Sequence, residues 1–191
     1  MSIGPQPNFH EYDVHRALHI IASKGPIGRH LLTKNLELTE CSVRTILKKL
    51  MQLEYIDSTP LGQIATDSGK EYVSSLHYYD NSEFIDAGQL SLGDYDFVIV
   101  KKSAAHLISS GIDQRDKAII IGGTGATVLI YANGALEMPP GFMDISDQYP
   151  EDVKRILSTF SLDEGDVVVI GSGSSKRYAQ LAAMAAYDSL V

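Results

Sequence analysis

The sequence predicts an α+β protein of two domains: a helical first domain, then a two-layer α/β sandwich with a mainly antiparallel sheet. Apolar residues recur at helical spacing up to Leu76, whereas short runs rich in β-branched residues follow Tyr95. The pair Asn133-Gly134 lies between two extended runs and favours the tight turn of an antiparallel hairpin. From Tyr95 onward the predicted order β-α-β-β-α-β-α contains the split unit found in two-layer sandwiches.

The composition is that of an ordinary globular protein. Of 191 residues, 44% are hydrophobic and 21% are charged, which leaves room for two small domains. No apolar run approaches the roughly 18–20 residues that cross a bilayer, and Met1–Gln6 lacks the basic and apolar stretches of a secretory signal. The single cysteine, Cys41, rules out an intramolecular disulfide. We therefore expect a cytoplasmic protein without membrane contact.

The segment "HYYDNSEFIDAGQLSLGD" interrupts the helical pattern with polar residues and glycines. It indicates a first domain over residues 1–76, a linker over 77–94 with room for a short strand, and a second domain over 95–191. Up to Leu76, eight basic residues balance eight acidic ones, so the whole net charge of −8 lies in the remainder. Because that remainder would repel nucleic acid, any DNA contact belongs to the first domain.

Four helices and a hairpin are predicted in the first domain. The first three helices cover Tyr12–Ser23, Gly28–Asn35 and a stretch that begins after the N-cap Thr39. In the second helix Leu31 and Leu32 point inward. The buried stripe of the third helix is Val43, Ile46, Leu47, Leu50 and Leu53. Strands at Tyr55–Ser58 and Gln63–Thr66 flank a Pro-Leu-Gly turn, and a last helix covers about Asp67–Leu76.

This order, together with "LEYIDSTPLGQIATDSGKEYV", resembles a winged helix-turn-helix over about Phe9–Leu76. In that family the third helix enters the major groove of DNA and the wing touches phosphates. The resemblance implies a groove-facing set on the third helix, namely Ser42, Arg44, Thr45, Lys48 and Lys49. It places Arg29, His30 and Lys34 near the DNA backbone.

The chemistry of the third helix agrees with that placement. Arg44 and Lys48 are four residues apart and share one helical face. Arginine binds guanine with two hydrogen bonds, while lysine and hydroxyl groups serve phosphates. Two alternatives stay open: a merely solvated face of an amphipathic helix, and contact with RNA or protein, which a domain of zero net charge also permits.

The second domain mixes strands and helices. The strands are Phe97–Val100, the two runs around Asn133-Gly134, and Asp166–Gly171. Ser103–Ser110 forms a helical turn, and Ile112–Ile121 suits a helix or a strand, with the helix preferred. A helix begins at Pro150 with Val153, Ile156, Leu157 and Phe160 inward, and another covers Ser174–Leu190. The hairpin argues against a doubly wound parallel sheet.

The strands Phe97–Val100 and Val167–Ile170 do not alternate between apolar and polar residues, which indicates a sheet covered on both faces. Helices cover one face, and either the last helix or a second subunit covers the other. The second alternative predicts a homodimer. The small residues Ala179, Ala182, Ala183 and Ala186 permit close packing of the last helix.

The whole layout resembles archaeal two-domain proteins in which a winged helix precedes a small domain of unassigned function. The likeness lies in "GIDQRDKAIIIGGTGATVLIYANGAL", "MPPG" and "GDVVVIGSGSSKRYAQLAAMAA". It implies a domain arrangement and no particular chemistry.

Two glycine segments are candidate sites for a small anion, because backbone N–H groups at a helix start bind phosphate or carboxylate. One comprises Gly123, Thr124 and Gly125. The other comprises Gly171, Ser172, Gly173, Ser174, Ser175, Lys176 and Arg177. Neither is a P-loop or a dinucleotide fingerprint, and such glycines also simply end or begin helices.

No signature of a hydrolase, kinase or metalloenzyme is present, so no catalytic residue, metal or cofactor is expected. Asp94, Asp96, Asp113 and Asp116 could pair as catalytic acids, but they are interpreted as acidic surface residues. The leading hypothesis is a transcriptional regulator that binds duplex DNA, dimerises through its second domain and senses a small anionic metabolite there. The alternatives are a metabolite or nucleotide enzyme with an accessory winged helix, and an RNA- or protein-binding factor.

Overall fold

The computed structural model describes residues 8–191, and the chain divides into two compact units, residues 1–77 and residues 78–191. Among the described helices, none has the length and apolar character needed to cross a membrane. Met1–Gln6, where we expected no secretory signal, lies outside the described range.

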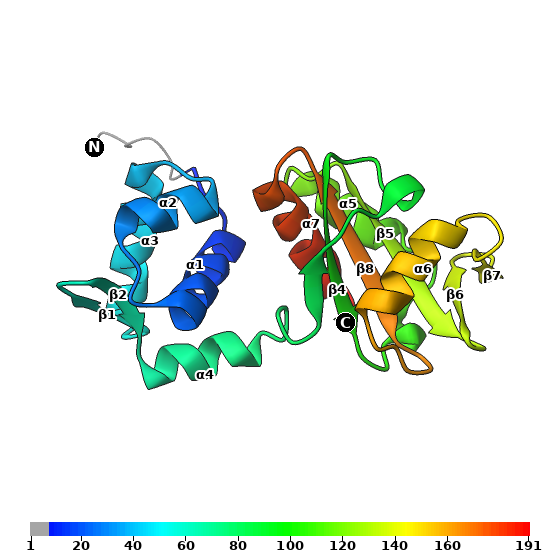
Figure 1. Cartoon of the computed structure of the whole chain (residues 1–191), viewed down its shortest axis with the longest axis horizontal. Coiled ribbons are helices and arrows are strands. Elements are labelled where there is room, and N and C mark those ends of the chain that lie inside the picture. Colours follow the sequence, from blue (N-terminus) through cyan, green and yellow to red (C-terminus); the bar gives the residue numbers. More distant parts are fainter. Residues whose placement is uncertain (1–7) are drawn as a thin grey trace. The chain divides into compact units, whose positions relative to one another are not determined.

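In its described residues, 8–77, the first unit contains four helices and one β-hairpin (Figure 1). In chain order its elements are α1 (Glu11–Lys24), α2 (Arg29–Leu36), α3 (Glu40–Gln52), β1 (Ile56–Thr59), β2 (Gly62–Ala65) and α4 (Asp67–Ser75). The Thr39 hydroxyl caps α3 by accepting a hydrogen bond from the Ser42 amide at 3.3 Å, as predicted. The predicted order of helices and strands is confirmed.

One apolar core holds the first unit together. Leu18 and Ile21 of α1, Leu32 and Leu36 of α2, and Val43, Ile46, Leu47 and Leu50 of α3 are all buried in it. Two predictions about this core were wrong, since Leu31 and Leu53 are about half exposed. Leu31 faces away because Leu32 and Leu36, four apart, define the buried side of α2, and Leu53 lies one residue beyond the end of α3.

The hairpin is tied to the turn between α1 and α2. Ile27 and Gln63 exchange two backbone hydrogen bonds, at 3.0 and 2.9 Å. Gly62 permits this approach, because a Cβ there would lie 2.5 Å from the carbonyl carbon of Ile27 and its φ is +134°. Because Gly62 and Gln63 directly follow the turn, the hairpin is fixed close to its turn.

The second unit is built on a six-stranded sheet. Its strands are β3 (Ser82–Phe84), β4 (Tyr95–Lys101), β5 (Gly125–Ala132), β6 (Ala135–Met138), β7 (Met143–Asp144) and β8 (Val167–Gly173). Its helices are η1 (Gly88–Leu90), η2 (Ala105–Leu107), α5 (Ile112–Ile120), α6 (Pro150–Thr159) and α7 (Lys176–Asp188). The strand order is β3-β4-β8-β5-β6-β7, and every neighbouring pair is antiparallel.

The antiparallel sheet, the Asn133-Gly134 hairpin and the helical state of Ile112–Ile120 confirm the predictions for these elements. The segment predicted as a linker, residues 77–94, differs: from Tyr78 it counts with the second unit, and β3 pairs with β4. The short strand expected in this segment is β3.

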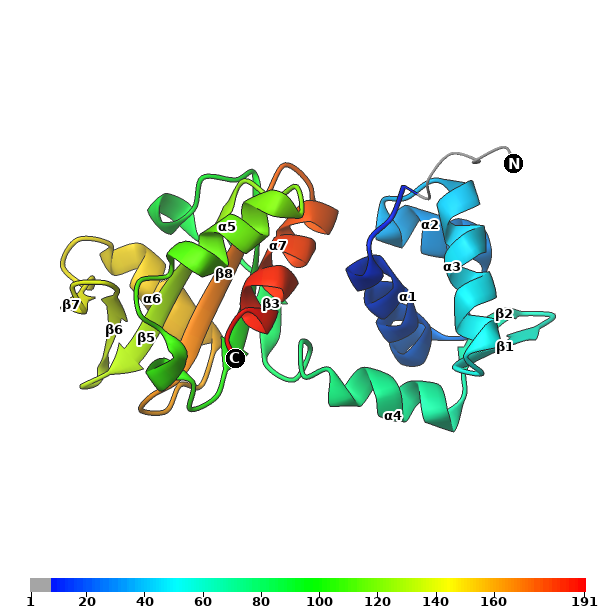
Figure 2. The same ribbon diagram turned by 180° about the vertical axis from the view of Figure 1, so that it is seen from behind.

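The prediction of two layers was wrong, because helices of the same chain cover both faces of the sheet. Figure 1 shows α6 over one face, and Figure 2 shows α5 and α7 over the other. On the α6 side Val168 and Ile170 of β8 pack with Val153 and Ile156, while Leu157 is exposed rather than inward. On the opposite side Val167 and Val169 of β8 pack with Ala186 and Leu190. Of the two alternatives for the second face, coverage by the last helix is confirmed, so a second subunit is not needed to cover it.

Helix α7 lies unusually close to β8. A Cβ on Gly171 would lie 2.1 Å from the Ala183 amide nitrogen, and one on Gly173 would lie 2.5 Å from that of Ala179. Ala179, Ala182, Ala183 and Ala186 are fully buried, so the predicted small face of this helix is confirmed as a packing surface. Glycines on the strand and alanines on the helix together bring the two backbones into contact.

Asp166, directly before β8, joins two loops at one end of the sheet. Its buried carboxylate accepts hydrogen bonds from the amides of Asp163 (2.7 Å) and Ser103 (3.0 Å) and from Lys102 Nζ (2.8 Å). Burial would raise the pKa of this carboxyl group, but these donors outweigh it and hold the pKa below its ordinary value of 3.8.

We expect Gly171→Ala to lower the free energy of unfolding by about 3 kcal/mol or more, because the new methyl group would meet helix backbone rather than a mobile side chain. Urea unfolding checks this. Gly141→Ala is the matched control, since a Cβ there makes only an ordinary contact, 3.5 Å from Met143 Cγ. Equal stability of the Gly171 variant and the parent would contradict the close packing.

We expect Asp166→Asn to cost about 2–3 kcal/mol at pH 7, because both carboxylate oxygens accept from N–H groups and an amide would turn its own N–H toward one of them. A carboxyl group whose pKa is lower in the folded than in the unfolded protein stabilises the fold at a pH above its unfolded pKa. This stabilisation is lost as the pH falls through the pKa of the folded protein. The difference between variant and parent should therefore shrink below about pH 4. Urea titrations from pH 3 to 7 measure this difference in the free energy of unfolding. Asp163→Asn is the control and should have only a small effect, because the Asp163 side chain is exposed.

Candidate functional site

The exposed side of α3 carries the first candidate surface. Arg44, Thr45 and Lys48 are exposed there, next to the exposed Cys41. The Thr45 hydroxyl donates to the Cys41 carbonyl at 3.1 Å, so it rests on its own helix, whereas the two cations extend from it. Arg44 and Lys48 thus form a cationic pair on one face, at the position that the sequence indicated.

Helix α2 adds further exposed positive charge. Arg29, His30 and Lys34 are exposed on it, and α2 packs against α3 in the core of the first unit. Within residues 8–191, Arg29, Lys34, Arg44 and Lys48 form no ion pair, whereas Arg16, Lys49 and Lys70 each pair with a carboxylate. The net charge of the unit is zero, but these pairings leave the cations of α2 and α3 available to an outside anion.

Two members of the expected groove-facing set are placed differently. Ser42 is only 5% exposed, and its hydroxyl lies 3.0 Å from that of the N-cap Thr39, so the prediction that it faces outward was wrong. Lys49 is half-buried and donates to Glu11 of α1 at 2.8 Å. Both side chains therefore make contacts within the unit. Ser42 lies in the first turn of α3 beside the cap, and Lys49 lies on the side of α3 that faces α1.

The tip of the β1–β2 hairpin is apolar rather than basic. Leu61 is 78% exposed beside Pro60, and the Thr59 hydroxyl closes the turn by donating to the Gly62 carbonyl at 2.8 Å. Residues 56–65 contain no lysine or arginine, and their one charged residue is Asp57. This hairpin therefore offers van der Waals and hydroxyl contacts without a cation.

The two glycine segments of the second unit lie side by side at one end of the sheet. The Thr124 amide donates to the Ser172 carbonyl at 2.9 Å, and Gly125 pairs with Ser172 across β5 and β8. The expected anion cradle does not form in the predicted way, because Gly171, Ser172 and Gly173 are buried strand residues. Gly123 is also used for packing, since a Cβ there would lie 2.6 Å from that of Ala182.

At the start of α7 only part of the second segment is accessible. The Ser175 hydroxyl caps the helix by accepting from the Tyr178 amide at 3.4 Å. Arg177 lies over the Tyr178 ring, 5.0 Å from its centroid. Ser174 and Lys176 are exposed and are the members that a solute could reach.

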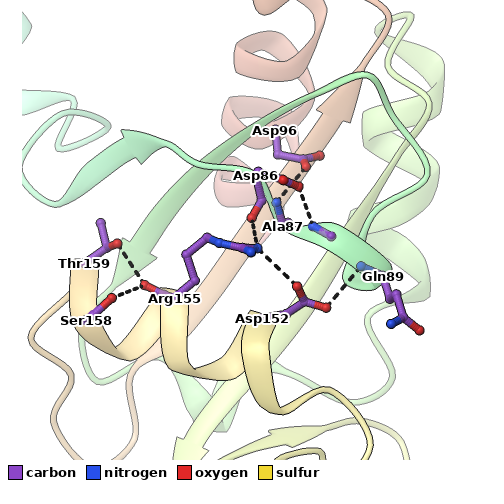
Figure 3. Close-up of polar contacts among 9 residues, drawn as sticks. Asp86, Ala87, Gln89, Asp96, Asp152, Arg155, Ser158 and Thr159 are labelled. Carbon is purple, nitrogen blue, oxygen red and sulfur yellow. Dashed lines mark hydrogen bonds and ion pairs between the residues drawn. The ribbon is translucent and has the colours of Figure 1, made fainter.

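A buried carboxylate organises the neighbouring loop over residues 85–93. Asp96 accepts from the Ala87 amide at 3.0 Å (Figure 3). It also accepts from the Ser172 hydroxyl at 2.8 Å and from the Ser91 hydroxyl. The interpretation of Asp96 as a surface residue was therefore wrong, because it is 7% exposed and fully hydrogen-bonded. Its only signal in the sequence was an acidic residue directly before an apolar strand.

Asp152 of α6 holds the other side of the same loop. It accepts from the Gln89 amide at 3.1 Å and from Arg155 at 3.1 Å, and Arg155 also donates to the Asp86 carbonyl (Figure 3). A pocket of about 240 Å³ opens between this loop and Lys176, with Phe84, Asp86 and Asp94 in its wall. The buried carboxylates of Asp96 and Asp152 are therefore used to position this loop.

His15 and His19 share a face of α1, but His15 is buried against Tyr72, 3.3 Å from its hydroxyl. Across residues 8–191, no cluster of three or more histidine, cysteine or acidic side chains has a geometry that could hold a metal ion.

Comparison with known proteins identifies relatives of both units. Residues 92–190 match the family described as domain of unknown function DUF4443, and residues 14–71 match the family described as PH0730-like, N-terminal domain. The solved structure of hypothetical protein PH0730 from Pyrococcus horikoshii OT3 is 29% identical and has a TM-score of 0.73; the match covers 94% of this chain and 92% of that one. No curated protein matches. None of these matches indicates an enzymatic family.

We expect Asp96→Ala to cost about 2–3 kcal/mol, because it removes the acceptor for one buried amide and two hydroxyl groups. Amide hydrogen exchange should rise over residues 85–93 in particular. Asp94→Ala is the matched control, since Asp94 is exposed and only two residues away. Unchanged exchange in this loop would show that Asp96 does not anchor it.

Proposed function

Since the chain belongs to the family of the domain of unknown function DUF4443, whose description names no activity, we propose its function from the first unit. We propose that this unit is a winged helix-turn-helix, that α3 binds the major groove of duplex DNA, and that the protein is a transcriptional regulator. The observation that carries the proposal is the exposed cationic pair Arg44 and Lys48 on α3, followed in the chain by a hairpin that is fixed close to its turn.

The element order supports this proposal. Helices α2 and α3 are joined by a short turn in which Glu37 adopts a left-handed conformation (φ +56°), and β1 and β2 follow α3 as a wing would. The paired backbone hydrogen bonds between Ile27 and Gln63 hold that hairpin in place. A recognition helix and a fixed wing are what a protein needs to meet a groove and its flanking backbone together.

The chemistry of the exposed residues assigns a role to each. Arg44 presents a planar guanidinium that can bind the N7 and O6 atoms of guanine, and Lys48 reaches a phosphate. On α2, Arg29 and Lys34 serve as further phosphate contacts, with His30 beside them. The wing contributes no cation, so its contact with DNA is made by Leu61 and the turn hydroxyls.

The charge distribution sets the expected strength of binding. With three phosphate contacts, the slope of log K against log salt concentration should be about −3, shallow for a DNA-binding protein. The second unit carries the net charge of −8 and is kept off the duplex by repulsion. For an anionic effector of that unit, only the exposed Ser174 and Lys176 are accessible binding groups among the glycine-segment residues.

We expect Arg44→Ala/Lys48→Ala to weaken binding to a selected duplex site by about 100-fold and to make the salt slope shallower by about 1. The duplex would come from in vitro selection with the full chain, and fluorescence anisotropy over a salt series would measure the affinity.

Lys117→Ala/Lys154→Ala is the matched control, because it removes two exposed cations from the second unit and gives the same net charge. Retained affinity in the Arg44/Lys48 variant would refute the groove assignment. Tighter binding to single-stranded or duplex RNA than to any selected DNA would favour an RNA-binding factor instead.

A further inference from the structure

Helix α5 exposes three isoleucines in nine residues. Ile112 is 51% exposed, Ile119 is 49% and Ile120 is 79%, whereas Gln114 and Ala118 form its buried side against the rest of the second unit. Figure 2 shows α5 on the outer side of the sheet, in the layer that it shares with α7. Large apolar side chains gathered on one exposed face usually mark an interaction surface.

The outward face has the spacing of a helix-packing seam. Ile112, Arg115, Asp116 and Ile119 stand at positions i, i+3, i+4 and i+7, which place them along one stripe. Arg115 and Asp116 occupy the middle of this stripe, where they contact each other at 2.9 Å (Nη2 to Oδ1), and the isoleucines occupy its ends. We call these four residues the α5 seam.

We propose that the α5 seam is the centre of a homodimer interface, in which α5 packs antiparallel against α5 of a second copy about a two-fold axis. With that axis between residues 115 and 116, Ile112 faces Ile119 of the second copy, and Arg115 faces Asp116 of the second copy. Both contacts occur twice, as a two-fold interface requires.

Charge complementarity identifies the second copy as the occupant. Read in reverse, the seam is Ile-Asp-Arg-Ile, so antiparallel pairing puts apolar residues against apolar residues and each charge against its opposite. The two Arg115–Asp116 pairs then form an alternating group of four charges flanked by isoleucines. Ile120 extends the apolar contact toward Gly111 of the second copy, a position without a side chain to obstruct it.

The size of the helix predicts a weak dimer. Two nine-residue helices bury less than the roughly 1,200–2,000 Å² of a standard stable interface, so we expect a dissociation constant of about 10–100 µM. This interface uses the outer surface of α5 and does not need an uncovered face of the sheet. It is also independent of DNA binding, so it is tested without DNA.

Sedimentation velocity of the full chain from about 1 to 500 µM tests the proposal across the expected dissociation constant. The parent should shift from monomer to dimer, and Ile119→Glu should raise the dissociation constant by at least about tenfold. Leu92→Glu is the matched control, since Leu92 is 92% exposed outside the seam and its substitution should leave the equilibrium unchanged. Urea unfolding should show that each variant keeps the parent stability.

Charge reversal tests the register. Arg115→Asp alone and Asp116→Arg alone each place like charges opposite one another and should weaken the dimer. The double variant Arg115→Asp/Asp116→Arg should restore it. A parent that stays monomeric at 500 µM, a dimer unaffected by Ile119→Glu, or a double variant no better than the single ones would each overturn the proposal. None of these outcomes depends on whether the first unit binds DNA.

Discussion

Direct backbone contact between β8 and α7 is the constraint on which the second unit depends. Gly171 and Gly173 bring the strand within reach of the amides of Ala183 and Ala179, a distance that any side chain on the strand would prevent. Because β8 lies between β4 and β5, this contact positions the helix over the centre of the sheet. Gly171 and Gly173 were candidates for ligand binding in the sequence. In the structure they are required for α7 to pack against the sheet.

The local patterns of the sequence predicted most elements of the fold. Three predictions that depended only on neighbouring residues are confirmed. They are the helix cap at Thr39, the hairpin turn at Asn133-Gly134 and the strand over the β-branched run Val167–Ile170. The non-alternating strands indicated that both faces of the sheet are covered, but the number of layers formed by one chain was not predictable in this way. It depends on which face of the sheet α6 and α7 each cover, and their periodicity says only that each helix has one apolar side.

The candidate sites were partly predictable for a related reason. Helical spacing gives the relative directions of Arg44 and Lys48, and both are exposed. Spacing cannot show that Glu11 of another helix pairs with Lys49, or that Ser42 joins the helix cap. Asp96 and Asp152 were missed because each accepts a hydrogen bond from a backbone amide of the loop over residues 85–93. Every residue except proline has such an amide, so residue types do not show which amide a carboxylate binds.

The place of β8 in the sheet also governs when the second unit can fold during synthesis. β4 and β5 each pair with β8 and not with one another, yet β8 is the last strand to leave the ribosome. Until residues 167–173 emerge, both earlier strands have an open hydrogen-bonding edge and uncovered apolar side chains. The first unit, complete by Ser75, has no such delay. The nascent chain therefore passes through an interval in which a finished amino-terminal unit is followed by an unclosed sheet, and this is the stage at which chaperones have most to protect.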